Sequence, residues 1–365
     1  MKIAVNSRVL PQPGTGIPYY IKNLYSKLQE IDKKNSYIFF QTSRKKTVGK
    51  TFIVSGKING FFAALFDLFF VNKLIKQHKP EIFHGTSFMM PFFRRKGVKY
   101  VVTIHDLAFL ALKKEPNDYS FFYYLFTKYG IKRSLQVADI VIADSFNTKN
   151  DIIKYYRTKA EKIEVVHLGI NEEFLQNKIN KRLIKEKYIL SVSTNPKRKN
   201  TLSVLRALSK SQKLKGYNYV IAGLIPEQQK TELLAEIRNL NLDRRVKIFG
   251  YASEDQLSNL YQNAELFIYP SFYEGFGFPV VEAMTANCPV ITSNNSSLIE
   301  LMPNKDWLVN PYSISNIRRK MEKLIGLTDK EKTALVKKNR KFAERFSWDI
   351  SAGLMIKLFK KITSE

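Results

Sequence analysis

Short apolar runs alternate with longer amphipathic segments along the first half of the chain. This alternation is typical of a parallel sheet whose consecutive strands are connected by helices. The pattern predicts a first strand at 2–5, a loop with prolines and glycines at 11–16, and a helix at 17–31. Further apolar runs predict strands at 37–40, 51–54, 82–84, 100–104, 140–142 and 162–166.

The same rhythm restarts in the second half, after a polar and lysine-rich stretch. Apolar runs predict strands at 188–192, 219–222, 246–249, 266–269, 290–292 and 306–309. Helical spacing predicts helices at 201–214, 227–239, 254–263, 280–286 and 348–362. The second half therefore predicts a second α/β unit.

These patterns predict the fold class α/β, with two doubly wound Rossmann-like domains. We expect a first domain at 1–172, a linker at 173–187, a second domain at 188–345 and a C-terminal helix at 346–365. In open parallel sheets, ligands bind at the carboxyl ends of the strands. Candidate chemistry should therefore follow the strands directly.

Composition agrees with two globular domains. The chain has 365 residues, of which 44% are hydrophobic and 25% charged, and this length suffices for two domains. The single cysteine, Cys288, excludes a disulfide framework and fits a reducing compartment. The first residues become polar too early for a signal peptide, and the longest apolar run, 61–71, is too short to span a bilayer.

The charge balance points to anionic partners. The chain has 60 basic and 32 acidic residues, which gives a net charge of +28. No zinc-ligand spacing or recognition motif supports nucleic-acid binding. Basic clusters at 44–46 and 94–96 lie near apolar stretches, and the segment 61–70 is either a core helix or a face for a membrane interface. An anionic membrane surface is the favoured macromolecular partner.

The most informative segment lies between Glu274 and Glu282, two carboxylates around a glycine-rich turn. Glu274 follows a predicted strand, and Gly275 and Gly277 let the backbone approach a ligand closely. The helix that follows would direct its N–H groups and positive dipole end at that ligand. An anionic, hydroxyl-rich ligand such as a nucleotide sugar suits this layout, although glutamates at this spacing also occur by chance.

The surroundings of this segment resemble the donor-binding region of the family-4 retaining glycosyltransferases. The resemblance rests on six ordered blocks, at 246–251, 257–261, 269–271, 274–279, 282–284 and 288–290. It implies the GT-B architecture, in which the two domains face each other across a cleft and the C-terminal helix packs back on the first domain. It also implies a nucleotide-sugar donor, and no cofactor.

The loop at 193–200 supplies cations for such a donor. It resembles the family's Gly-Thr-x-x-Pro-Arg-Lys-Asn loop, with Arg198 and Lys199 as the basic pair and Ser193 in place of the usual glycine. A cationic pair here can neutralise a diphosphate leaving group. A solvated basic turn is the alternative interpretation, and it is the one we favour for Lys197.

The resemblance also assigns the remaining site residues. Glu282 would bind the ribose hydroxyls, Glu274 the donor sugar near the reacting centre, and Tyr251 either stacks on the base or covers the domain surface. Backbone groups of the glycine-rich segment and of the loop before the first helix would bind sugar and phosphate: Gly275, Phe276, Gly277, Phe278, Gly14 and Gly16.

His105 is the catalytic histidine that the resemblance implies, placed beside a donor-sugar hydroxyl. It follows a predicted strand, as do His84 and Thr86, which we expect to line the acceptor side. The chain contains no D-x-D pair and no histidine–carboxylate cluster with metal spacing. The catalytic set is therefore His105, Glu274, Arg198 and Lys199, without a metal.

The resulting hypothesis is a retaining, metal-independent hexosyltransferase. Its donor would be GDP-mannose or a UDP-sugar, and its acceptor a saccharide or lipid-linked saccharide of envelope polysaccharide synthesis. We expect a cytoplasmic protein with peripheral contact to the inner face of the plasma membrane. Two alternatives stay open at this point: a GT-B sugar-nucleotide epimerase, and a basic protein that binds anionic surfaces.

Overall fold

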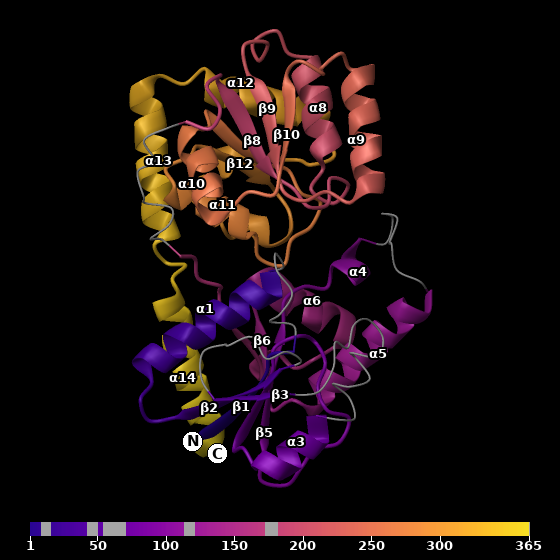
Figure 1. The fold of residues 1–365 in the computed structure, drawn as a ribbon, viewed down its shortest axis with the longest axis vertical. Helices are drawn as coiled ribbons and strands as arrows, with labels where there is room; N and C mark the ends of the chain where they lie inside the picture. The colour runs from indigo at the N-terminus through magenta and orange to yellow at the C-terminus, as the bar shows by residue number, and fades with distance from the viewer. Residues whose placement is uncertain (9–15, 42–49, 54–70, 113–120, 172–181, 365) are drawn as a thin grey trace. The chain divides into compact units, whose positions relative to one another are not determined.

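The computed structural model describes residues 1–8, 16–41, 50–53, 71–112, 121–171 and 182–364 (Figure 1). They form two compact units. Unit 1 comprises Met1–Gly169 together with Ser347–Glu365, and unit 2 comprises Ile170–Phe346. The sequence boundaries at 172 and 346 thus lie close to the structural ones. Part of the expected linker lies outside the described residues, and its end belongs to unit 2, where Ile184 is buried.

Unit 1 contains a seven-stranded sheet in which all neighbouring strands are parallel. Its order is β3-β2-β1-β4-β5-β6-β7. The order reverses direction at β1, so β1 and β4 flank the switch point where ligands bind in such sheets. The strands are β1 (Lys2–Asn6), β2 (Ser36–Gln41), β3 (Lys50–Ile53), β4 (Ile82–Gly85), β5 (Lys99–Ile104), β6 (Ile140–Ala143) and β7 (Ile163–Val165).

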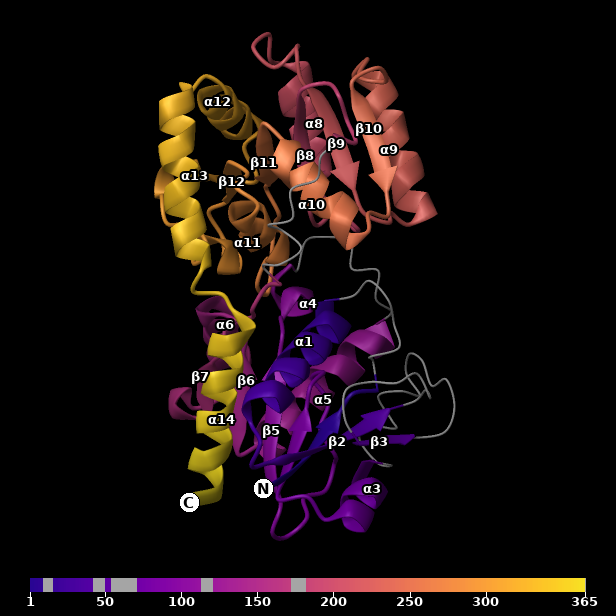
Figure 2. The same ribbon diagram turned by 60° about the vertical axis from the view of Figure 1, so that its left-hand side comes forward.

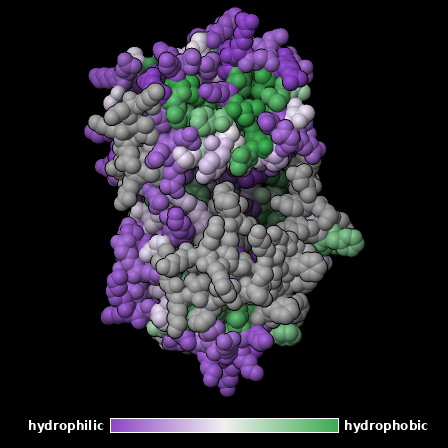
Figure 3. All heavy atoms as spheres, in the orientation of Figure 1, coloured by the Kyte–Doolittle hydropathy of each residue, from purple (hydrophilic) through white to green (hydrophobic). Residues whose placement is uncertain are grey.

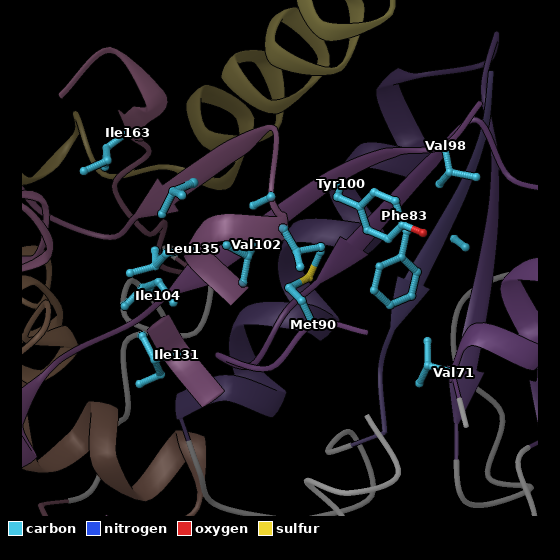
Figure 4. Packing of buried hydrophobic residues seen from close by; sticks show 14 of the residues in the cluster. Val71, Phe83, Met90, Val98, Tyr100, Val102, Ile104, Ile131, Leu135 and Ile163 are labelled. Carbon is cyan, nitrogen blue, oxygen red and sulfur yellow. The ribbon is translucent and has the colours of Figure 1, made fainter. Parts of the chain in front are cut away.

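Buried aliphatic and aromatic side chains from these strands form the core of unit 1. Phe83, Tyr100, Val102 and Met90 lie in one cluster (Figure 4). Strands of a parallel sheet are apolar on both faces because helices cover both. The helices of unit 1 are α1 (Gly16–Ile31), α3 (Val71–His78), α4 (Ala108–Ala111), α5 (Phe121–Val137), α6 (Phe146–Tyr156) and α14 (Trp348–Ser364).

Helix α14 returns the chain to unit 1 and packs against α1 (Figures 1 and 2). Its inner face is the buried series Trp348, Met355 and Phe359, at helical spacing. Trp348 lies edge-on to Tyr19 of α1 at 6.1 Å between ring centroids. The last helix is therefore part of the core of unit 1.

Unit 2 contains a six-stranded parallel sheet, in the order β10-β9-β8-β11-β12-β13. Its strands are β8 (Tyr188–Val192), β9 (Asn218–Ala222), β10 (Val246–Gly250), β11 (Leu266–Tyr269), β12 (Val290–Ser293) and β13 (Leu308–Val309). Its helices are α8 (Thr201–Ser209), α9 (Glu227–Asn239), α10 (Glu254–Asn263), α11 (Phe278–Thr285), α12 (Ile314–Ile325) and α13 (Asp329–Ala343). The predicted α/β class with two doubly wound sheets is confirmed.

Several element boundaries differ from the sequence pattern. Helix α8 ends at Ser209, five residues before the predicted 214, because the Ser211 hydroxyl accepts a hydrogen bond from the Leu214 N–H and closes a separate turn. The last strand shrinks to Leu308–Val309, because a 3₁₀ turn capped by Asn304 precedes it. Helix α11 begins at Phe278, earlier than predicted, with a proline in its first turn. The membrane-or-core segment 61–70 and the basic cluster 44–46 lie outside the described residues.

Hydrophilic residues cover most of the described surface in Figure 3, as expected for a chain with 25% charged residues. Among the described residues, no helix has the length and apolarity that crossing a membrane requires.

Substitution of Phe359 tests the place of α14 in the core. Phe359 is fully buried, so Phe359→Ala should lower the free energy of unfolding of unit 1 by about 3–5 kcal/mol. The control is Leu354→Ala on the same helix, where the side chain is 37% exposed and a much smaller loss is expected. Urea unfolding followed by circular dichroism measures both variants, and equal losses would contradict the packing.

Candidate active site

The loops after β8 and β11 meet at the carboxyl edge of the unit 2 sheet. The carbonyl oxygen of Arg198 accepts a hydrogen bond from the Phe272 N–H in the second loop at 3.0 Å, and the Ser271 hydroxyl oxygen also lies 3.0 Å from it. The side-chain amide of Asn200, in the loop after β8, donates to the Pro311 carbonyl at 2.7 Å. This bond connects the loop after β13 to the loop after β8. Neighbouring strands of a parallel sheet thus deliver residues distant in sequence to one edge.

Glu274 lies at the centre of this edge and is paired with both predicted cations. Its Oε1 is 2.6 Å from Lys199 Nζ, and its Oε2 is 3.2 Å from Arg198 Nη1. The Ser271 hydroxyl donates to Oε1 at 2.6 Å. Burial of the carboxyl would by itself raise its pKa, but Arg198 and Lys199 outweigh burial and lower the pKa of Glu274 to about 2. The site is therefore an ionised carboxylate between two cations.

The two cations differ in how accessible they are. The Lys199 side chain is 11% exposed, its Nζ hydrogen-bonds the Tyr269 hydroxyl, and it lies 4.8 Å from the centroid of that ring. The Arg198 side chain is 29% exposed, and its Nη1 also donates to the Tyr273 carbonyl. The positive charge of Lys199 is therefore mostly buried beside Glu274, whereas that of Arg198 is more accessible to solvent. Lys197 pairs with Glu232 outside this cluster.

The glycine-rich turn has the geometry that the sequence predicts at Gly277. This residue has φ +114° and caps α11, a conformation that favours glycine. A Cβ there would lie 2.8 Å from Leu298 Cδ2. The turn is fixed by the Ser297 hydroxyl, which bonds the carbonyl oxygens of Glu274 and Phe276 at 2.9 and 2.6 Å. Because C=O and N–H point in opposite directions across a trans peptide, the N–H groups of Gly275 and Gly277 point away from Ser297.

Glu282 has the opposite electrostatic environment to Glu274. It is the fifth residue of α11, and its Oε2 accepts a hydrogen bond from the Tyr261 hydroxyl at 2.9 Å. Burial raises the pKa of Glu282 to about 7; the Tyr261 bond opposes this rise, and the negative charge of Glu254 adds to it. Near neutral pH both the protonated and the ionised form of this carboxyl are therefore populated.

Tyr251 and Phe276 complete the predicted donor set in unit 2. Tyr251 follows Gly250 at the end of β10, and its side chain is 65% exposed. Phe276 is buried and packs edge-on against Phe278, with 5.4 Å between ring centroids. Tyr251 therefore offers a side-chain face to solvent, whereas Phe276 has a packing role besides any backbone role.

His105 belongs to a separate cluster in unit 1. Its Nδ1 is 2.6 Å from Asp144 Oδ2, and its Nε2 is 2.8 Å from the Thr86 carbonyl oxygen. Burial lowers the pKa of His105, but the Asp144 carboxylate more than offsets this, and the pKa lies above its ordinary value. In this structure both ring nitrogens are engaged within unit 1. The sequence interpretation missed Asp144, although it follows β6 as His105 follows β5.

The expectation that His84 lines the acceptor side is wrong. His84 is fully buried, and its ring nitrogens bond the hydroxyls of Tyr25 and Thr103. Burial, with the nearby charge of His105, lowers the pKa of His84 to about 3, so the ring is neutral. His84 is a core residue. Gly14 lies outside the described residues, and Gly16 is the first residue of α1.

The structure thus brings Arg198, Lys199 and Glu274 into direct contact and places His105 in the other unit. In the part of the chain that the structure describes, no three histidine, cysteine or acidic side chains gather as metal ligands would.

Comparison with known families identifies both halves of the chain. Residues 172–342 match the family described as "Glycosyl transferases group 1", and residues 39–174 match "Glycosyltransferase Family 4".

Curated relatives are 23–30% identical to this chain over the aligned residues. The serotype-specific mannosyltransferase WbdA of Escherichia coli is 28% identical over 281 residues, which cover 72% of this chain and 34% of WbdA. The O-antigen chain mannosyltransferase RfbU of Salmonella typhimurium is 30% identical over 241 residues, covering 65% of this chain and 63% of RfbU. The match therefore spans about a third of the length of WbdA.

Solved structures with the same fold cover nearly the whole chain. Sucrose-phosphate synthase from Thermosynechococcus elongatus superposes with a TM-score of 0.80 at 18% sequence identity. The superposition covers 100% of this chain and 99% of the synthase chain. Anabaena Alr3699/HepE, solved in complex with UDP and glucose, has a TM-score of 0.74 at 17% identity and covers 99% of this chain and 100% of its own.

The raised pKa of Glu282 predicts how stability depends on pH. Its pKa is 4.5 in an unfolded chain and about 7 in the folded one, so the folded state binds the proton more tightly. The stabilisation of the folded state by this tighter proton binding is fully present below pH 4.5 and is lost as the pH rises through 7. Glu282→Gln removes the titration, so the variant should gain about 2–3 kcal/mol relative to wild type between pH 5 and pH 8. Urea unfolding at both pH values measures this, and parallel pH profiles would contradict it.

Proposed function

Because this chain belongs to the family-4, group 1 glycosyltransferases, we propose that it transfers a hexosyl group from a nucleotide sugar to a saccharide or lipid-linked saccharide, with retention of configuration. The observation that carries this proposal is the contact of Glu274 with Arg198 and Lys199 at the carboxyl edge of the unit 2 sheet. The mannosyltransferase names of the relatives support mannose as the group and polysaccharide synthesis as the setting.

The charges at this edge suit a nucleoside diphosphate leaving group. Two cations and one carboxylate leave a net charge of about +1, and the N-terminus of α11 adds a positive dipole end. Arg198, the more exposed cation, would meet the diphosphate first, and Lys199 would hold Glu274 in place and add its own charge to the stabilisation of the leaving group. We propose that these groups, rather than a divalent ion, stabilise the charge that develops on the leaving phosphate.

The two glutamates would hold opposite ends of the donor. Glu282, when ionised, accepts hydrogen bonds from two ribose hydroxyls, and binding would therefore favour its ionised form. Glu274 stays ionised at all working pH values, since its pKa is about 2, and accepts hydrogen bonds from hydroxyls of the donor sugar. With retention, the acceptor hydroxyl attacks the face from which the phosphate departs, and the leaving phosphate accepts its proton.

Contact with an anionic membrane on the cytoplasmic side is a second part of the proposal. The exposed phenylalanines of unit 1 include Phe92, Phe93 and Phe122, which are 39, 62 and 82% exposed. Aromatic rings beside basic side chains suit a membrane interface. Of the basic cluster 94–96, Arg94 is already paired with Asp139 and Arg95 donates to the Asn72 carbonyl, so the support comes mainly from the aromatic side chains and the net charge of +28.

A screen of nucleotide sugars tests the donor. Saturating GDP-mannose, UDP-glucose or dTDP-rhamnose should raise the melting temperature by about 5 °C for the correct donor. Glu282→Ala should abolish most of this increase for every nucleotide, because the ribose contact is common to all of them. If no nucleotide sugar and no nucleoside diphosphate raises the melting temperature, the proposed function is wrong.

Substitution of Lys199 tests the leaving-group role of the cation pair. Lys199→Ala should lower kcat by about 10²–10³-fold, with a smaller effect on the KM for the donor. Lys197→Ala is the matched control, because this neighbouring lysine pairs with Glu232 outside the cluster and should leave kcat unchanged. Sugar release from a radiolabelled donor measures both, and wild-type turnover in Lys199→Ala would exclude the role.

A further inference from the structure

An exposed aromatic pair lies beside the candidate site and has no role in the function proposed above. Phe272 follows β11, and Tyr312 follows β13. Their ring centroids are 5.0 Å apart and their planes are inclined by 32°. The Tyr312 side chain is 71% exposed, whereas Phe272 is half-buried beneath it. Tyr312 therefore presents an aromatic face to solvent.

Hydrogen bonds of the backbone hold the two loops that carry these rings. The Phe272 N–H donates to the Arg198 carbonyl at 3.0 Å, and the Phe272 carbonyl accepts from the Asn295 amide at 2.8 Å. The Tyr312 N–H donates to Asn310 Oδ1 at 3.0 Å. The aromatic face is thus anchored directly to the loop that carries Arg198, and a ligand bound on it would lose little of its affinity to ordering these loops.

The pair lies next to the residues proposed to hold the donor sugar and phosphate. Phe272 is two residues before Glu274 in the loop after β11. Pro311, the neighbour of Tyr312, accepts a hydrogen bond from the Asn200 amide at 2.7 Å, so the loop after β13 lies against the loop that carries Arg198. A saccharide bound on the pair would therefore lie beside the proposed donor site.

Two of the stretches beside the pair suit a neutral, hydroxylated ligand. The stretches 292–299 and 308–317 contain no charged residue, in a chain with 25% charged residues. They are rich in asparagine and serine, whose amides and hydroxyls both donate and accept hydrogen bonds. An anionic ligand would find no cation in these stretches, whereas sugar hydroxyls match their chemistry.

We propose that Phe272 and Tyr312 form a saccharide subsite that stacks on a pyranose ring of the acceptor. The electron-rich face of an aromatic ring attracts the C–H groups on the apolar face of a pyranose, and the neighbouring amides bind its hydroxyls. This inference rests on the proposed function, since it treats the saccharide as the acceptor, but the binding it predicts is measured without a donor.

Binding of neutral oligosaccharides tests the subsite. Isothermal titration and saturation-transfer NMR with mannotetraose, maltotetraose and chitotetraose should show binding of at least one of them to the wild-type chain. Tyr312→Ala should weaken it about fivefold, and Tyr312→Trp should retain it, because one aromatic stacking contact contributes about 0.5–1.5 kcal/mol. The matched control is Tyr129→Ala in unit 1, where the side chain is 62% exposed and no change is expected.

The outcomes separate this inference from the proposed function. Equal oligosaccharide binding by wild type and Tyr312→Ala, or no binding by wild type, overturns the subsite. Weaker binding of GDP or UDP to Tyr312→Ala also overturns it, because the pair would then belong to the nucleotide site. If oligosaccharide binding depends on Tyr312 while no nucleotide sugar stabilises the chain, the subsite stands and the proposed transferase function fails.

Discussion

The carboxyl edge of unit 2 depends on the pairing of one buried carboxylate with two cations. Glu274 is 6% exposed, and a buried charge of this kind is tolerated only when it is paired and hydrogen-bonded. Arg198 and Lys199 supply the pairing, and both come from the loop after β8, whereas Glu274 comes from the loop after β11. The same contact therefore stabilises the ionised glutamate, joins two loops and positions the cations before any ligand arrives, which reduces the reorganisation that catalysis would require.

Environment, and not residue type, distinguishes the two glutamates of the glycine-rich segment. Cations surround Glu274 and lower its pKa to about 2, whereas Glu282 accepts a hydrogen bond from the Tyr261 hydroxyl and burial raises its pKa to about 7. One carboxyl is permanently charged, and the other changes charge near neutrality. In unit 1 the same principle operates on histidines, because His105 pairs with the Asp144 carboxylate, whereas the ring nitrogens of His84 bond the hydroxyls of Tyr25 and Thr103.

The sequence predicted the parts of the structure that depend on local pattern. Apolar runs located the strands because strands buried on both faces carry a continuous apolar signal, and the order of strands and motifs pointed to Arg198, Lys199 and Glu274. Contacts between distant residues carry no such signal. Asp144 lies 39 residues after His105, and Tyr312 lies 40 residues after Phe272, and only the sheet order brings each pair together. Local pattern also misplaced His84, because the sequence around a histidine at a strand end does not show whether its side chain is buried or exposed.

The placement of α14 in unit 1 has a consequence for biosynthesis. Unit 2 is one continuous stretch whose ends lie side by side, with the Ile170 N–H bonded to the Phe346 carbonyl at 3.1 Å. It can fold as soon as its own residues have left the ribosome. Most of unit 1 is synthesised before unit 2, but unit 1 lacks a core helix until residues 348–364 emerge. Its nascent sheet must therefore stay soluble with an apolar face uncovered while unit 2 is made, a period in which chaperones would find a binding surface.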